Sequence, residues 1–218
     1  MQKPWENKYD NIWETKFAHL WVVGNGTGKI GVYDSNSDTI IVPLVYNSVW
    51  STPSPNLWII IKNWIVGVHD SSKKKNVVPL IYDNIWYTKF PNLWIVEKDG
   101  MIGVSYNKSH VFTVPIMYDS VWETNLSNMW IIYMNGKWGI YCSDMRHELL
   151  PPIFHDISRE DLDILSVYFS ARTKFDFNLK ECLWVLPQDV VAYCKKYKKN
   201  FLIWACLYTL TPEMVLRP

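Results

Sequence analysis

The sequence predicts a mainly β protein: an open stack of four three-stranded antiparallel β repeats of about 36 residues, with a small C-terminal α-helical cap. Three observations predict this fold. A short aromatic motif recurs five times, a glycine recurs at a spacing of 36 residues, and the residues after 157 break that period. A fixed period of this size is typical of repeat architectures, in which each unit buries its apolar face against its neighbours.

The recurring motif is Tyr82-Asp83-Asn84-Ile85-Trp86. Near copies of it begin at four other aromatic residues: Tyr9, Tyr46, Tyr118 and, in a decayed form, Phe154. Eight residues after the motif Trp of each full copy stands a second Trp: Trp21, Trp58, Trp94 and Trp130. Because side chains alternate between the two faces of a strand, we expect Tyr82, Asn84 and Trp86 to share one face of an extended segment.

Each repeat contains a predicted β-hairpin. Asp99-Gly100 and Asn135-Gly136 are dipeptides that favour two-residue hairpin turns, because both of their residues adopt positive φ angles readily. In the first repeat the corresponding segment, residues 24–28, is one residue longer, and turns tolerate such insertions. The third repeat is therefore predicted to pair residues 93–98 with residues 101–106.

A glycine inside each hairpin is followed twelve residues later by a proline. The pairs are Gly31 and Pro43, Gly67 and Pro79, Gly103 and Pro115, and Gly139 and Pro151. Proline cannot donate a hydrogen bond to a β-ladder. The extended segment that contains it is therefore predicted to lie at a sheet edge or to bend at the proline, and it completes the three strands of each repeat.

These residues together resemble the WG repeats of bacterial proteins, over residues 5–158. The segment Asn135-Gly136-Lys137-Trp138-Gly139-Ile140-Tyr141 is the most similar one. The other three repeats have an aliphatic residue in place of Trp138: Ile30, Val66 and Ile102. The resemblance implies a repeat scaffold, and it supplies no catalytic residue.

The period divides the sequence into a predicted repeat array, residues 1–157, and a predicted helical domain, residues 158–218. Ser158 precedes Asp161 by three residues, as in a helix capping box, and apolar residues from Leu162 to Phe169 follow at helical spacing. Pro187-Gln188-Asp189 predicts a further helix start. Five aromatic motifs against four hairpins favour the open stack over the alternative, a small closed propeller-like arrangement.

Composition limits the class of partner. The formal net charge is only +1, so we expect no binding to nucleic acid or to an anionic membrane. No apolar run is long enough to predict a membrane span or a signal peptide, and we expect a cytoplasmic protein. The four cysteines form no Cys-x-x-Cys pair, which favours reduced thiols over a disulfide or a zinc site.

Several features resemble catalytic or ligand sites, but each has a simpler structural interpretation. Residues 24–29 are rich in glycine but lack the spacing of a phosphate loop. Asp144, His147 and Glu148 lie close in sequence without a nearby nucleophile. The motif carboxylates, at Asp10, Asp83, Asp119 and Asp156, are expected to accept backbone amides, and Asn47 replaces one of them. The lysines of 73–75 and 195–199 are expected to be solvated. We therefore predict no enzyme, no metal site and no cofactor.

The aromatic columns are the remaining candidates for a binding site. The predicted binding residues are Trp13, Trp50, Trp86, Trp122, Tyr46, Tyr82 and Tyr118. The same rings could instead form the core, where the loss of a Trp typically costs about 3–5 kcal/mol. The sequence thus favours a non-catalytic, tryptophan-rich scaffold that binds another protein, for example as an inhibitor, immunity or anti-defence factor of a bacterium or phage. The alternative is a glycan-binding module that uses the Trp and Tyr rows.

Overall fold

The structure is a computed structural model that describes residues 6–107, 112–159, 164–170, 173–178 and 183–185. These residues form five four-stranded antiparallel sheets and one short 3-10 helix, η1 (Glu6–Lys8), so the mainly β prediction is confirmed. The chain divides into two compact units, residues 1–112 and 113–218.

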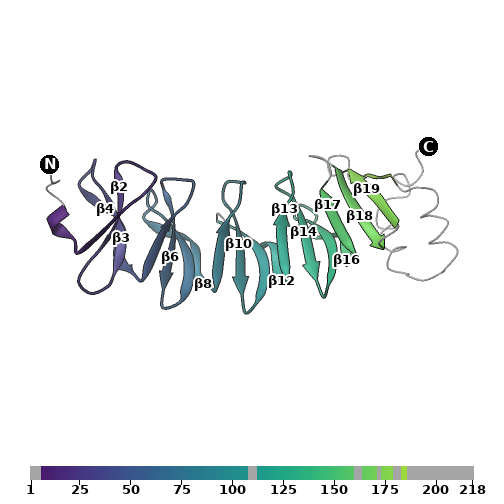
Figure 1. Cartoon of the computed structure of the whole chain (residues 1–218), viewed down its shortest axis with the longest axis horizontal. Coiled ribbons are helices and arrows are strands. Elements are labelled where there is room, and N and C mark those ends of the chain that lie inside the picture. Colours follow the sequence, from purple (N-terminus) through teal and green to yellow (C-terminus); the bar gives the residue numbers. More distant parts are fainter. Residues whose placement is uncertain (1–5, 108–111, 160–163, 171–172, 179–182, 186–218) are drawn as a thin grey trace. The chain divides into compact units, whose positions relative to one another are not determined.

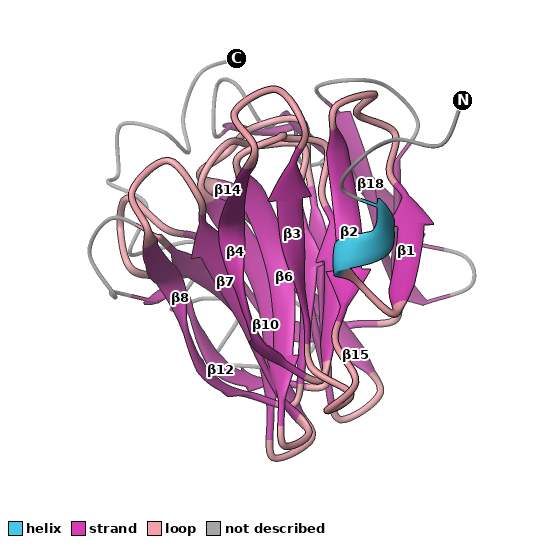
Figure 2. Ribbon diagram, turned by 90° about the vertical axis from the view of Figure 1, so that its left-hand side faces the viewer, coloured by secondary structure: helices cyan, strands magenta, loops and turns pink. Residues whose placement is uncertain are grey.

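The first three sheets are simple antiparallel meanders (Figure 1). The first sheet has the order β1 (Asn11–Glu14), β2 (Leu20–Gly24), β3 (Ile30–Asp34) and β4 (Thr39–Tyr46). Figure 2 shows these four strands in that order, with η1 in cyan. The second has the order β5 (Ser48–Ser51), β6 (Leu57–Lys62), β7 (Ile65–Asp70) and β8 (Lys75–Tyr82). The third has the order β9 (Asn84–Tyr87), β10 (Leu93–Lys98), β11 (Met101–Tyr106) and β12 (Phe112–Tyr118).

Unit 2 contains two further sheets of the same kind. The fourth sheet has the order β13 (Ser120–Glu123), β14 (Met129–Met134), β15 (Lys137–Cys142) and β16 (His147–Phe154). The fifth has the order β17 (Asp156–Arg159), β18 (Ile164–Ser170), β19 (Thr173–Asn178) and β20 (Leu183–Val185).

The predicted hairpin of the third repeat is confirmed. Leu93 pairs with Tyr106, and Lys98 pairs with Met101. The turn residues Asp99 and Gly100 have φ angles of 54° and 76°, as a two-residue type I′ turn requires. The asparagine–glycine turn of the fourth repeat has almost the same angles, 52° and 76°.

The glycine and proline columns meet across the last two strands of a sheet. In the fourth sheet Ile140 pairs with Leu150 and Trp138 with Phe154, so β16 bulges where it passes Gly139. A methyl group on Gly139 would lie 2.8 Å from the backbone nitrogen of Pro152. The last strand of each of the five sheets is an edge strand. The prediction of an edge position or a bend at the proline is therefore confirmed, since both are found. The glycine is needed because the bulged backbone crosses directly over it.

Neighbouring sheets share their cores within each unit. In unit 1 one buried cluster joins Leu20, Val32 and Val42 of the first sheet to Val49, Trp58 and Ile60 of the second. In unit 2 another joins Ile131, Ile140 and Leu150 of the fourth sheet to Ile157, Leu165 and Val167 of the fifth. Each sheet is too small to bury its apolar face alone, and stacking supplies the cover.

The prediction of three strands per repeat is wrong, because each sheet has four. The motif that we expected to be one extended segment belongs to two sheets. Tyr82 ends β8, and Asn84 begins β9 in the next sheet, with Asp83 between them. The last strand of one sheet and the first strand of the next are therefore joined by a single residue.

The predicted helical cap is also wrong for the described residues after 157. Ile164–Ser170 is strand β18, which pairs with β17 on one side and β19 on the other. The predicted domain boundary at residue 158 falls inside β17. The decayed motif at Phe154 thus opens a fifth sheet with its own hairpin, and the count of four hairpins that favoured the open stack does not hold. The helix start predicted at Pro187 lies outside the described residues.

Candidate binding surface

The junction between sheets sorts the two aromatic residues of the motif into different environments. The junction tyrosines are buried, with exposed fractions of 6% for Tyr46, 2% for Tyr82 and 1% for Tyr118. The motif tryptophans, Trp13, Trp50, Trp86 and Trp122, are 41–57% exposed. The predicted shared face is therefore wrong, because the chain passes into the next sheet between the Tyr and the Trp.

The buried tyrosines cannot contact a partner, and their hydroxyls bond within the protein instead. Tyr118 Oη donates to Glu148 Oε1 at 2.9 Å, and burial, together with this carboxylate, raises the pKa of Tyr118. Burial also raises the pKa of Tyr46 and of Tyr82. Tyr46, Tyr82 and Tyr118 are thus core residues, and the prediction that they belong to a binding site is wrong.

Each motif Trp is the third residue of the first strand of its sheet, which is an edge strand. The second column behaves in the opposite way, since Trp58, Trp94 and Trp130 are at most 3% exposed. The sequence left open whether the tryptophans form the core or a binding surface, and the two columns differ in this respect. In the second column Trp58, Trp94 and Trp130 are core residues and Trp21 is partly buried, whereas the first column presents indole rings to solvent.

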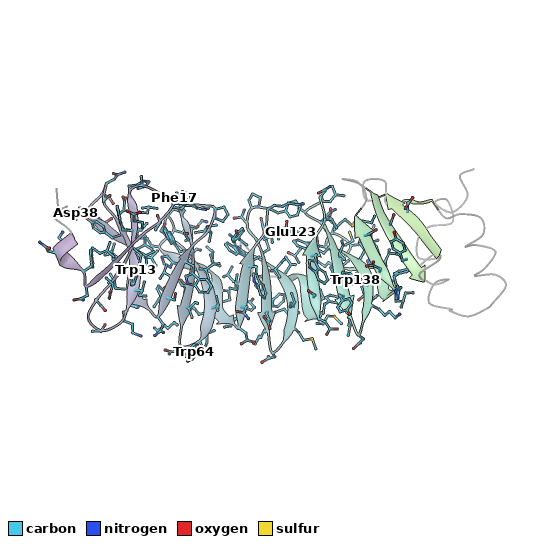
Figure 3. All side chains as sticks on the ribbon, in the orientation of Figure 1. Trp13, Phe17, Asp38, Trp64, Glu123 and Trp138 are labelled. Atoms are coloured by element: carbon cyan, nitrogen blue, oxygen red, sulfur yellow. The ribbon has the colours of Figure 1, made fainter. Side chains whose placement is uncertain are left out.

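The support behind the exposed tryptophans differs between the units. In unit 1 the Trp13 ring packs over Gly24. In unit 2 Trp122 stacks on Trp138, with ring centroids 4.8 Å apart, and Tyr133 lies against both rings. Figure 3 shows Trp13 and Trp138 on their sheets. Trp138 is the only Trp that matches the WG pattern, and here it forms a base for the exposed ring of Trp122.

A threonine two residues after each motif Trp holds the following loop, and the sequence analysis missed this column. Thr52 Oγ1 lies 2.8 Å from the carbonyl oxygen of Leu57 and 3.1 Å from that of Ser54, and it accepts the Ser54 amide. Three other threonines make the same contacts: Thr15, Thr88 and Thr124. Their regular spacing was visible in the sequence and could have revealed a structural role. These loops fix the strand that carries each exposed Trp.

The motif carboxylates brace the hairpin turns. Asp83 Oδ2 accepts the backbone amide of Asp99, and Asp119 Oδ2 accepts that of Asn135, both at 2.7 Å. Asn47 Oδ1 accepts the amide of Asn63 at 2.9 Å, so a neutral amide oxygen serves equally well. The prediction that the motif carboxylates accept backbone amides is confirmed at Asp83 and Asp119, and Asn47 makes the same contact.

The acidic and histidine residues of 144–148 and the glycine-rich loop do not form a catalytic or phosphate-binding site in the described structure. Asp144 accepts a bond from Asn128, His147 contacts the Met145 carbonyl, and Glu148 accepts the Tyr118 hydroxyl. The amides of the glycine-rich loop close on the Asn25 side chain instead of facing outward. In the part of the chain that the structure describes, no three His, Cys, Asp or Glu residues are grouped to hold a metal.

The basic clusters also have local explanations. Lys73 Nζ forms an ion pair with the buried Asp70, 2.5 Å away, and the remaining lysines of this turn are exposed. The cluster of residues 195–199 lies outside the described residues. Among the described helices, none is long and apolar enough to cross a membrane.

Trp64 is a second feature that the sequence analysis missed. It is 93% exposed and lies in the turn between β6 and β7 (Figure 3). Aligning the repeats would have found it, because the corresponding turn positions are Gly100 and Gly136. The second sheet therefore exposes two aromatic rings, Trp50 on the edge strand β5 and Trp64 in the turn between β6 and β7.

No protein-family model and no curated protein matches the sequence. Among solved structures, Hsv2 of Kluyveromyces marxianus is 11% identical with a TM-score of 0.40, over 80% of this chain and 63% of that one. The computationally designed Ika8 protein is 12% identical with a TM-score of 0.38, over 80% of this chain and 59% of that one. This chain thus spans less than two thirds of the length of these structures.

Proposed function

We propose that this protein is a non-catalytic scaffold that binds another protein through its exposed tryptophans. The observation that carries the proposal is the repeated exposure of an indole at one position of four successive sheets, at Trp13, Trp50, Trp86 and Trp122. Trp is enriched among the residues that contribute most to binding at protein interfaces. Rings that remain about half exposed are not explained by packing in the core. The buried Trp58, Trp94 and Trp130 of the second column supply the rigid support.

More specifically, the scaffold is proposed to act as an inhibitor, immunity or anti-defence factor. It would act in the cytoplasm of a bacterium or phage-infected cell by covering a surface of its target. The repeats are proposed to be of the WG type and to form an open array. Binding without catalysis fits such a role, because occupation of the target surface is sufficient for inhibition.

Glycan binding is the second candidate, and one observation favours it. Asn84 and Trp86 lie two residues apart on β9, and Asn84 Nδ2 donates to Glu97 Oε2 at 2.8 Å. An exposed ring beside an amide and a carboxylate can stack on a sugar while the polar groups bond its hydroxyls. This arrangement belongs to the third sheet and does not recur at Trp50, whose strand has Ser48 in the position of Asn84.

The deciding experiment is affinity purification of the tagged protein from its native cells, followed by reconstitution of the complex from purified components. A stoichiometric protein partner that rebinds the wild type and loses affinity for Trp50→Ser supports the proposal. Trp50 is exposed, so this substitution is expected to leave the melting temperature nearly unchanged. Repeated recovery of the protein alone, together with Trp fluorescence quenching on a polysaccharide, would replace protein binding with glycan binding.

A further inference from the structure

The β6–β7 turn is built like the other two-residue turns of the repeat, but it has an unusual residue in its second position. Asn63 and Trp64 have φ angles of 52° and 68°. The equivalent pairs, Asp99-Gly100 and Asn135-Gly136, have angles of 54° and 76°, and of 52° and 76°. The three turns therefore share their backbone geometry, and of these three second positions only Trp64 has a side chain larger than hydrogen.

A Trp is a poor choice for this position on grounds of stability. Left-handed backbone conformations are unfavourable for residues with a β-carbon, and glycine avoids that cost. The side chain recovers none of this cost by burial, since it is 93% exposed. Residues held in such conformations are frequently found where a ligand or partner is bound. Trp64 thus combines an unfavourable backbone conformation with an exposed ring. Packing within the protein explains neither the conformation nor the exposure.

The backbone of the turn that carries Trp64 is held in place. The Asn63 amide donates to Asn47 Oδ1 at 2.9 Å, which ties the turn to the junction between β4 and β5. Pairing of Lys62 with Ile65 closes the hairpin immediately behind the turn. A rigid support of this kind lowers the entropy cost of binding.

The shape and charge of the turn specify the kind of partner. A ring at the tip of a two-residue hairpin turn projects outward, so it fits a concave pocket better than a flat surface. Lys62, Asn63, Trp64 and Ile65 are all exposed, and among the described residues Lys62 has no ion pair. A pocket that accepts an indole and has carboxylates at its rim would complement this turn. A bilayer is less well matched, because the corresponding turns of the first and third sheets, residues 25–29 and 99–100, are polar.

We propose that Trp64 is the anchor of the interface: it inserts into an apolar, acid-rimmed pocket of the protein partner. This inference rests on the proposed function and names the residue that dominates the contact. Anchors of this kind typically contribute at least about 2 kcal/mol, which corresponds to about 30-fold in affinity.

The test compares Trp64→Gly with the wild type in two measurements. Without partner, we expect the variant to melt at the same temperature or roughly 2–4 °C higher, since glycine suits the turn. With the purified partner, calorimetry should show an affinity at least about 30-fold lower. Met145→Ser is the control, because it removes another exposed apolar side chain, 51% exposed, from a turn outside the proposed anchor.

Four outcomes would overturn the inference. A marked loss of melting temperature in Trp64→Gly would make Trp64 a structural residue. Equal partner affinity of Trp64→Gly and wild type would remove Trp64 from the interface while leaving the proposed function intact. Binding of the wild type, but not the variant, to vesicles of phosphatidylcholine and phosphatidylglycerol would assign the ring to a membrane surface. Absence of any partner for the wild type would instead refute the proposed function itself, and with it a protein pocket for Trp64.

Discussion

At the scale of single residues, the threonine two residues after each motif Trp is expected to contribute to the stability of the fold. Thr52 is 2% exposed, and its hydroxyl is the hydrogen-bond partner of backbone groups on both sides of the loop. Thr52→Val keeps the shape but leaves these groups unsatisfied, which should lower the free energy of unfolding by about 1–3 kcal/mol. Urea unfolding measures this loss. Thr52→Ser retains the hydroxyl and should recover most of it, whereas equal stability of the Val variant would contradict the assigned role.

The buried Tyr33 predicts that the protein loses stability at alkaline pH. Burial and the bond to Asp38, 2.5 Å away, raise the pKa of Tyr33 from 10.0 to about 12. Below pH 10 the group is protonated in both the folded and the unfolded chain, so it does not change stability. Between pH 10 and 12 the unfolded chain loses this proton while the folded chain retains it, so stability falls as the pH rises.

Absorbance of tyrosinate at increasing pH, followed together with Trp fluorescence, checks this prediction. We expect Tyr33 to ionise together with unfolding, and Tyr33→Phe to flatten the loss of stability over this pH range. Tyr87→Phe is the control, because Tyr87 is 55% exposed. A stability that does not change between pH 10 and 12 would contradict the prediction.

At the scale of the secondary-structure element, the glycine under each bulge should be intolerant of any side chain. A methyl group on Gly139 would meet three backbone atoms of β16, among them Pro152 N at 2.8 Å and Pro151 C at 2.9 Å. Backbone atoms cannot rotate away, so Gly139→Ala should lower the free energy of unfolding by about 1–3 kcal/mol. Thermal melting measures the effect. Gly24→Ala is the matched control, since its nearest neighbours would be side-chain atoms at 3.5 Å, and an equal loss in both variants would refute the steric explanation.

The elements that sequence could predict are those fixed by local chemistry. The hairpin from Leu93 to Tyr106 was predicted with its register because the Asp99-Gly100 turn determines the pairing. The strand β18 was mistaken for a helix because a short apolar run fits both periods. Its buried residues, Leu165 and Val167, alternate as in a strand and pack on the fourth sheet, which local sequence does not reveal. The exposure of Trp50 and burial of Tyr46 likewise depend on a change of sheet at Asn47.

At the scale of the whole molecule, the arrangement of the five sheets determines whether the motif tryptophans form one continuous surface. A closed ring of 218 residues would be compact, with a radius of gyration of about 17 Å. In an open array each sheet contacts only its neighbours in sequence, and the radius grows with the number of sheets. The proposed open array predicts a radius clearly above about 17 Å in small-angle X-ray scattering of the monomer. A value near 17 Å would establish the closed arrangement, and a target would then have to engage a few sheets at a time instead of the full row of tryptophans.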